Sequence, residues 1–405
     1  MFCLIVFVCC RLELCILIAN DTGDNAMEAA DIFEAAKKIQ NDLVTHRRTL
    51  HKNPEVGSHL PHTADYVRQQ LSALGYTPIS LCDSGIVATI TGQDTGRCIL
   101  LRADMDALAV TEDTQLDFHA TNGNMHACGH DMHTAILFGV LQAMNRTRDF
   151  EGTLFGLFQP GEELNPGGAV KVLEEHPFEG YDIAAVIGEH VDATLEVGEI
   201  GICPGQFMAS NDELRFYISG RGGHAARRST IDDSVTAMAD MILRSTSLNT
   251  AECVLSIGRV IADGATNVIP ESVYAEGTMR TFDKELRERT HSYLHNNARA
   301  IAEKYNVKAE VDISFGYPCV VNDVMLAYEA MIVASDEGIT VKELKPMTTA
   351  EDFGHYTEIY PSLFYRLGVG SNAGGSHTAT FLPDERAIKV GERMMQRMAL
   401  HILNK

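Results

Sequence analysis

Positive charge is scarce in this chain. Its 405 residues include 33 Lys and Arg against 55 Asp and Glu, which gives a formal net charge of -22. The summed negative field repels phosphate groups, so the composition disfavours nucleic acid and anionic membrane surfaces as partners. The charge leaves the nature of the reaction open.

A framework of closely paired cysteines is also absent. Four of the ten Cys lie within the first fifteen residues, and the other six are scattered singly. This usage is typical of a reducing compartment and favours a cytoplasmic location. Cys128 alone stands among other residues of metal-ligand type, and we expect most of the others to pack as small hydrophobic side chains.

The N-terminus lacks both a basic leading segment and a clear small-residue cleavage site. Its apolar run is interrupted by Arg11 and Glu13, which makes it a poor transmembrane helix. Three interpretations of residues 1–26 remain open: an upstream extension, a cleaved signal that would export the protein, and a membrane anchor. Because Met27 opens an amphipathic helix, we expect residues 1–26 to be dispensable for the function of the protein.

Strands and helices alternate along most of the chain, which predicts an α/β sandwich. Apolar periodicity predicts helices over residues 28–50, 63–74 and 134–144, and strands over 86–91, 98–101, 154–158, 183–187 and 363–367. The last four strands run into residues of ligand type: Asp104 and Asp106, Glu162 and Glu163, Glu189 and His190, and finally His377. Open α/β sheets place their sites just past the carboxyl ends of the strands.

Residues 211–316 follow a different pattern and contain none of the clustered ligands. Their order of strand, helix, two strands, helix and strand predicts a ferredoxin-like α+β domain. The length of the chain allows two domains, each with its own core. We therefore predict that this domain is inserted into the first, whose two parts are residues 27–210 and 317–405.

The run from Met125 to His133 places three His, one Cys and one Asp within nine residues. Such a density of ligand types favours a metal site over a His-rich start of a buried helix. The candidate ligands are Cys128, His130, Glu163, His190 and His377. Five protein ligands are too many for one tetrahedral ion with an open position, so they predict two divalent ions. A thiolate favours zinc, whereas carboxylate and imidazole also admit manganese, cobalt or nickel.

Acidic residues beside these ligands are candidates for catalysis and support. Glu162 adjoins Glu163 on an extended loop, so its side chain diverges and can act as a general base; the alternative is a pair of solvated loop acids. Asp104 and Asp106 share one face of an extended segment and can orient ligating imidazoles. For either Asp alone, a structural salt bridge that includes Arg102 is an equally good interpretation of why an acidic residue stands there.

Polar residues in the inserted domain are weaker candidates. His224 follows two glycines at the end of a predicted strand, and Asn267 and Arg280 lie near two later strands. Taken singly, each is more often explained by turn chemistry or a surface charge.

In its ordered motifs the chain resembles the M20 metallopeptidase family, and within it the amidohydrolase subfamily of hippurate, auxin-conjugate and N-acetyl-diaminopimelate hydrolases. The resemblance runs from about Arg47 to Ala399 and is carried by the segments 47–55, 102–108, 126–131, 159–163, 220–225, 267–270, 277–280 and 350–353. It implies a dinuclear site with the five ligands named above and Glu162 as general base. It also implies that His224, Asn267 and Arg280 hold the substrate carboxylate or the developing oxyanion.

The resemblance further implies a homodimer, in which the inserted domain acts as a lid and mediates dimerisation, and in which its His can serve the partner's active site. His133 resembles a helix residue of the family and not a ligand. The expected activity is metal-dependent hydrolysis of N-acyl amino acids. A dipeptidase or carboxypeptidase, and a catalytically silent relative that binds acyl-amino acids, remain the alternatives.

Overall fold

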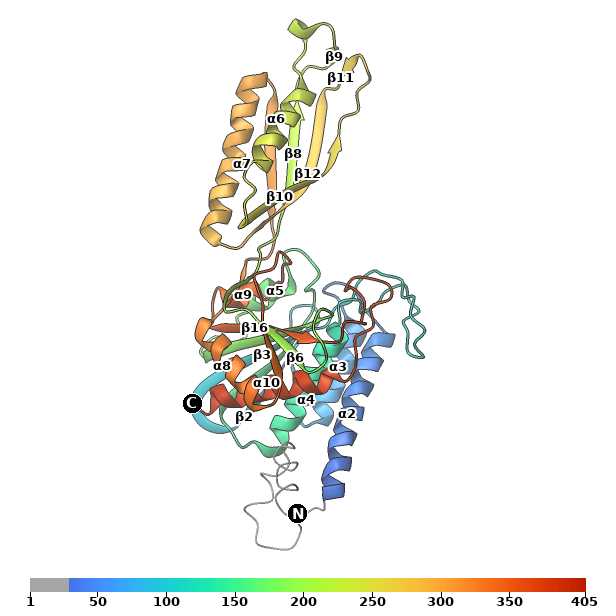
Figure 1. Ribbon diagram of the computed structural model, residues 1–405, viewed down its shortest axis with the longest axis vertical. Helices are drawn as coiled ribbons and strands as arrows, with labels where there is room; N and C mark the ends of the chain where they lie inside the picture. The colour runs from blue at the N-terminus through green and yellow to red at the C-terminus, as the bar shows by residue number, and fades with distance from the viewer. Residues whose placement is uncertain (1–28) are drawn as a thin grey trace.

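An eight-stranded mixed sheet organises the larger part of the protein in the computed structural model, which describes residues 29–405 (Figure 1). Its strands are Ile79–Leu81 (β1), Gly85–Thr91 (β2), Gln93–Asp104 (β3), Glu151–Gln159 (β4), Asp182–Asp192 (β5), Glu199–Ile202 (β6), Thr340–Glu343 (β15) and Ser362–Gly368 (β16). They stand in the order β1-β2-β4-β3-β5-β16-β6-β15. The four central strands β4, β3, β5 and β16 run parallel, so their carboxyl ends meet at one edge.

Two apolar cores lie on opposite faces of this sheet. Ile99 and Leu101 of β3 enter one core and Leu100 enters the other, because successive side chains of a strand point to opposite faces. The first core is covered by the helices Ala29–Lys52 (α2), Pro61–Ala73 (α3), His130–Thr147 (α4), Val324–Asp336 (α8) and Ala387–Leu403 (α10). The second is covered by Gly168–Glu174 (α5), Gly354–Thr357 (α9) and the strand pair Gly205–Met208 (β7) and Val320–Asn322 (β14). This arrangement confirms the predicted α/β class.

Residues 212–315 form a separate antiparallel sheet with its own apolar core. The strands stand in the order β10-β12-β8-β13, and the helices α6 and α7 pack against them. The bounds are Asp212–Ser219 (β8), Ser234–Thr246 (α6), Cys253–Ile261 (β10), Ser272–Thr281 (β12), Lys284–Tyr305 (α7) and Lys308–Phe315 (β13). A two-stranded ribbon of Gly223–His224 (β9) and Val268–Ile269 (β11), with the short helix Arg228–Thr230 (η2), lies at its far end (Figure 1).

The chain crosses between the two sheets at residues 209–211 and 316–319, directly after β7 and before β14. These crossings lie beside the boundaries predicted at 210/211 and 316/317. The division into separately folding domains, and the use of the inserted unit as a lid or for dimerisation, stay predictions.

The structure differs from the sequence-based expectations at several element ends. Strand β5 continues to Asp192, so Glu189 and His190 lie inside the strand and not beyond it. Strand β3 begins at Gln93, five residues before its predicted start at 98, because Gln93 pairs with Glu151 of β4. Helix α4 begins at His130, four residues before its predicted start. Residues 1–26 lie outside the described part of the chain.

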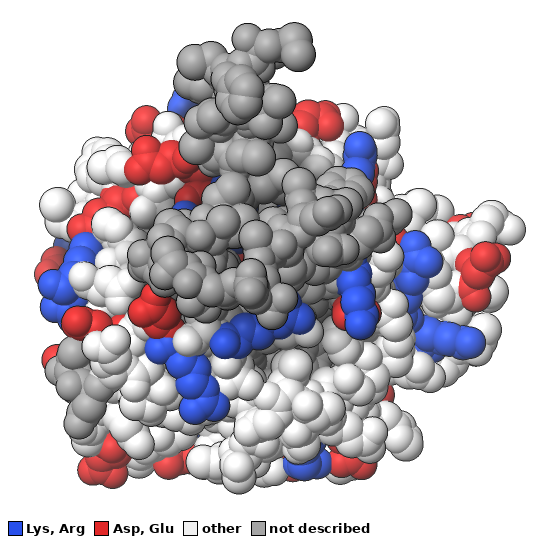
Figure 2. Space-filling model, turned by 90° about the horizontal axis from the view of Figure 1, so that it is seen from below, with Lys and Arg blue, Asp and Glu red and all other residues white. Residues whose placement is uncertain are grey.

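Figure 2 shows the end of the molecule at which α2 begins. Acidic and basic side chains of the described residues are interspersed on this face. Within residues 29–405, no helix is both long enough and apolar enough to cross a membrane.

Candidate metal centre

The five predicted metal ligands converge at the carboxyl edge of the central parallel strands. Cys128 lies in the loop before α4, and His130 is the first residue of that helix. His190 comes from β5, Glu163 follows β4, and His377 lies in the loop after β16. The ligands therefore come from segments that are remote in sequence, as the strand-end pattern predicted.

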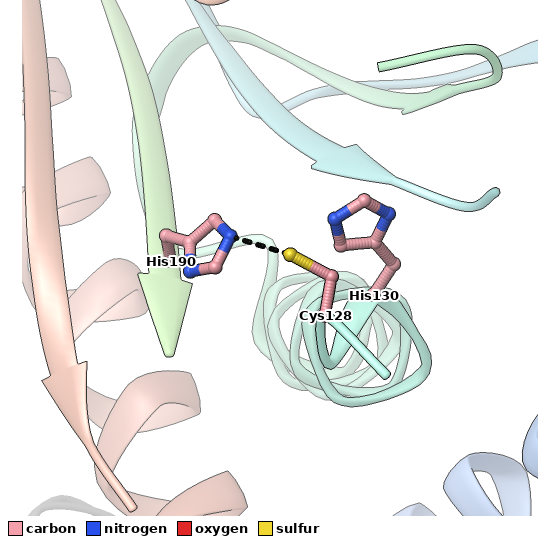
Figure 3. A group of neighbouring side chains, drawn as sticks. All are labelled: Cys128, His130 and His190. Carbon is pink, nitrogen blue, oxygen red and sulfur yellow. Dashed lines mark hydrogen bonds between the residues drawn. The ribbon is translucent and has the colours of Figure 1, made fainter. Parts of the chain in front are cut away.

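Two imidazoles lie close to the sulfur of Cys128. Its Sγ lies 3.2 Å from Nε2 of His190 and 3.3 Å from Nε2 of His377. Figure 3 shows His190 reaching from β5 toward Cys128 and His130 at the start of α4. The potential ligand atoms of Cys128, His130 and His190 lie within 4.8 Å of one another, and so do those of Cys128, Glu163 and His377. Cys128 therefore belongs to both groups.

The backbone orients two of the imidazoles. Nδ1 of His190 donates to the carbonyl of Val191 at 2.7 Å, and Nδ1 of His130 donates to the carbonyl of Asp106 at 2.8 Å. In each ring the proton on Nδ1 leaves the lone pair of Nε2 free for a cation. Nε2 of His130 is buried and has no hydrogen-bond partner, which fits a coordinating atom.

Glycine is required between Cys128 and His130. Gly129 has φ of 91°, and a Cβ there would lie 2.5 Å from Cγ2 of Val191. The left-handed conformation and the close approach both exclude larger residues. This turn aims both side chains into the same space.

Glu163 and His377 close the outer side of the site. Oε1 of Glu163 lies 3.2 Å from Nε2 of His377, whose side chain is half exposed. Burial opposes ionisation of Glu163, but His377 and His130 lower its pKa, so the carboxylate is charged at neutral pH. His377 takes a φ of 64° and its backbone N–H donates to Ala127, which fixes the loop beside Cys128.

The donor set fits divalent metal ions. Soft sulfur, two or more imidazoles and a carboxylate are the ligands of zinc and related ions. Burial raises the pKa of the Cys128 thiol to about 12, so a coordinated cation is what would hold it as the thiolate.

Glu162 lies beside the ligands but is not needed to complete either group. Its side chain is 6% exposed, and Oε2 lies 3.9 Å from Nε2 of His130. Burial raises the pKa of Glu162 well above its usual range, and the nearby Glu351 adds to the effect. A raised pKa makes a carboxylate a better proton acceptor, as a general base requires. The burial argues against a solvated loop acid.

The two acidic residues after β3 support different parts of the site. The carboxylate of Asp106 accepts from the backbone N–H groups of Glu162 and Glu163, at 2.9 and 3.0 Å. Asp104 accepts from Nδ1 of His133 at 2.6 Å and pairs with Arg102 at 2.6 Å. For Asp104, the structure contains both the contact with an imidazole and the alternative salt bridge.

His133 has both ring nitrogens engaged. Nε2 accepts from the backbone N–H of Val191 at 3.0 Å, so Nδ1 carries the proton that is donated to Asp104. Burial lowers the pKa of His133, in keeping with the neutral ring. This geometry agrees with the expectation that His133 is not a ligand.

A buried network of charged side chains lies beside Glu162, and no role was predicted from the sequence for its acidic members Glu351 and Asp352. Nη2 of Arg102 lies 2.6 Å from Asp352 and 3.0 Å from Glu351, while its Nε donates to Gln159 at 3.1 Å. Carboxylate oxygens of Glu162, Glu351 and Asp352 lie within 4.8 Å of one another. The motif at 350–353 was visible in the sequence, but only the fold brings it beside Gln159 and Arg102.

The three predicted substrate-binding residues do not meet within one chain. His224 and Asn267 belong to the ribbon at the far end of the inserted unit, where Ala225 N–H donates to the Asn267 carbonyl at 2.9 Å. Arg280 lies at the other end of β12, eight residues beyond its start and thus about 25 Å along the strand. Its Nη1 contacts Asn211 and Thr278. A shared role in substrate binding would need the ribbon of a second chain.

Comparisons with known proteins agree with this geometry. The profile described as peptidase family M20/M25/M40 matches residues 100–401. The chain belongs to this family. It is 34% identical over 379 residues to an N-acetylcysteine deacetylase of Bacillus subtilis, covering 91% of this chain and 99% of the relative. The enzyme is thus a hydrolase of the M20 family.

This M20 hydrolase is also similar to a second characterised relative and to a solved structure. An N-acyl-L-amino acid amidohydrolase of Geobacillus stearothermophilus is 35% identical over 305 residues, covering 73% of this chain and 82% of its own. A solved Bacillus subtilis structure, described as a dinuclear metal-binding peptidase of the M20 family, superposes with a TM-score of 0.81 at 33% identity. The superposition includes 91% of this chain and 99% of the solved one. The likeness and the ligand groups support divalent metal ions at this site.

Proposed function

We propose that this M20 hydrolase is a dinuclear-metal-dependent amidohydrolase that cleaves the amide bond of N-acyl amino acids. The observation that carries the proposal is the position of Cys128 in two ligand groups with Glu162 beside them. Cys128, His130 and His190 would hold one ion, while Cys128, Glu163 and His377 would hold the other. The bound ions would supply Lewis-acid activation of a water molecule and of the substrate carbonyl.

Glu162 takes the proton of the attacking water and returns it to the leaving amine. Burial raises its pKa, which makes the carboxylate a stronger base for the first step. Asp106 fixes the backbone of Glu162 and Glu163, so the base and a metal ligand keep a constant relative position. Arg280, on the inserted unit, would receive the substrate carboxylate, for which a guanidinium is well suited.

The names of the relatives support N-acetyl and other N-acyl amino acids as the substrate class. Zinc or manganese is the proposed metal, with cobalt or nickel as further candidates, since the ligand set admits all four. The separation of His224 and Asn267 from Arg280 supports a homodimer in which each ribbon serves the partner. A cytoplasmic location rests on the scattered cysteines.

One substrate screen tests this function. Metal-free protein is reloaded with zinc, manganese, cobalt or nickel, and amino acid release is measured over N-acetyl and N-benzoyl amino acids and dipeptides. We expect release from the N-acyl amino acids, and a loss of about 10²–10⁴-fold for Glu162→Gln with its metals retained. Release from dipeptides alone would replace the proposal with a dipeptidase. Binding without release in all four metal forms would indicate a silent relative.

A further inference from the structure

Tyr317 lies on the segment that returns the chain from the inserted unit to the catalytic unit. It follows β13 by two residues and precedes β14 by three. Its phenol is buried, and its hydroxyl contacts the carbonyl of Glu162 and the carbonyl of Leu164, the latter at 2.9 Å. A crossing segment therefore touches the backbone of the candidate base directly.

The backbone of Glu162 is held on both sides. Its N–H donates to Asp106, which belongs to the central sheet region, and its carbonyl accepts from Tyr317. The first contact ties the residue to the catalytic unit. The second ties it to the crossing segment, so the orientation of Glu162 depends on where that segment lies.

The other crossing segment is fastened to Tyr317. The backbone N–H of Asn211 donates to the Tyr317 carbonyl at 2.9 Å. A Cβ on Gly316 would lie 2.2 Å from the Asn211 carbonyl oxygen, so the two crossings are packed as closely as a glycine allows. The Asn211 side chain in turn accepts from Arg280. Contacts thus run without a break from Arg280 through Asn211 and Tyr317 to Glu162.

We infer that Tyr317 is a positioning residue that couples the inserted unit to Glu162, so that a substrate carboxylate held at Arg280 sets the orientation of the base. The inference rests on the proposed function for the roles of Arg280 and Glu162. It extends that function by making base alignment depend on substrate recognition. A purely structural Tyr317 would instead affect the stability of the fold and leave turnover per folded molecule unchanged.

Tyr317→Phe removes the hydroxyl and keeps the ring. Tyr76→Phe is the matched control, because its hydroxyl is also buried and donates to a backbone carbonyl, that of Leu141, at 2.8 Å. In full-length metal-loaded protein we expect Tyr317→Phe to lower kcat by about 10- to 100-fold with KM and metal content unchanged. Tyr76→Phe should leave kcat within about twofold of wild type. Equal kcat values for the two variants would overturn the inference.

Amide hydrogen exchange over residues 159–166 gives a readout that needs no turnover. Loss of the Tyr317 hydroxyl should accelerate exchange in this segment about 10-fold, while Tyr76→Phe leaves it unchanged. If wild type hydrolyses no N-acyl amino acid, the proposed function fails, and unchanged exchange would separately exclude the positioning role. If Tyr317→Phe does not fold, Asn211→Ala keeps the phenol and removes the contact with Arg280. It should lower kcat in the same direction, and a wild-type kcat in that variant would contradict the inference.

A double-mutant cycle tests the coupling itself. Contacts in a contiguous path are evidence of coupling only when the effects of the changes are non-additive. Arg280→Ala and Tyr317→Phe should together lower kcat/KM by less than the product of their separate losses, because either change alone breaks the same path. Losses that multiply would show that Tyr317 and Arg280 act independently.

Discussion

Asp106 holds Glu162 by its backbone: the Asp106 carboxylate accepts the Glu162 N–H at 2.9 Å across 56 residues of sequence. Its second oxygen accepts the N–H of Glu163 at 3.0 Å. One buried carboxylate thus sets the relative position of the candidate base and a candidate metal ligand. Both carboxylate oxygens are needed, because each accepts a different backbone N–H group.

Asp106→Asn should lower kcat by about 10-fold or more with a smaller change in KM, because an amide can accept only one of the two N–H groups and turns a donor toward the other. The unpaired buried N–H should also cost about 1–3 kcal/mol of unfolding free energy. Steady-state kinetics and urea unfolding measure the two effects. Asp323→Asn is the control for the change of charge away from the site, since a single oxygen of Asp323 accepts two backbone N–H groups at the start of α8 and the amide oxygen can keep both. A kcat loss of the same size in both variants would contradict a specific role for Asp106.

Cys128→Ser should lose metal at both positions, because Cys128 belongs to both ligand groups. Wild type should saturate at two ions per chain and the variant at fewer, as measured by elemental analysis after dialysis against dilute zinc. Cys98→Ser controls for the loss of a buried thiol away from the site. Saturation of wild type at one ion, with the variant unchanged, would refute the dinuclear assignment.

Replacement of Arg280 by Ala should weaken free-acid substrates more than the corresponding amides. A guanidinium that binds the substrate carboxylate contributes a charge-assisted hydrogen bond, which an amide substrate does not need. The ratio of kcat/KM for an N-acyl amino acid to that for its amide should fall by about 10-fold or more. Equal losses for both substrates would show that Arg280 acts only through its contacts with Asn211 and Thr278.

The pH dependence of stability should reveal Glu189. Burial raises its pKa to about 8, although the neighbouring hydroxyl of Tyr365 lowers it in part. Above the ordinary value of 4.5, the unfolded chain ionises while the folded carboxyl stays protonated, so this contribution to stability is lost as pH rises toward 8. Each pH unit in that window corresponds to about 1.4 kcal/mol.

Glu189→Gln cannot ionise, so this part of the pH slope should vanish in the variant. Urea unfolding of metal-saturated protein at several pH values from 4.5 to 8 measures the difference. The slopes of the two proteins should differ most near about pH 6, midway between the folded and unfolded pKa values, and less at either end of the window. Identical slopes across the whole window would show that Glu189 is already ionised in the folded state.

The candidate metal ligands could be located from the sequence because their signals are local. Cys128 and His130 stand in one short run, and Glu163 follows a predictable apolar strand. His190 lies close to Cys128, as predicted, but inside β5 and not beyond its end. The length of a strand depends on the strands with which it pairs. The pairing of β5 with β16 continues to Asp192, which apolar periodicity alone does not show.

The environment of Glu162 depended on contacts that no local pattern contains. Arg102 meets Asp352 across 250 residues, and Tyr317 meets Glu162 across 155. The separation of Arg280 from His224 follows from the pairing of β12 with β8: Ser272 pairs with Ser219 at the end near the β9–β11 ribbon, whereas Arg280 lies at the other end of β12. The sequence by itself determined the fold class, the ligand types and the candidate base, because periodicity and short motifs are properties of neighbouring residues. Only the tertiary structure decided which charges surround that base and which unit reaches it, because those contacts depend on the path of the whole chain.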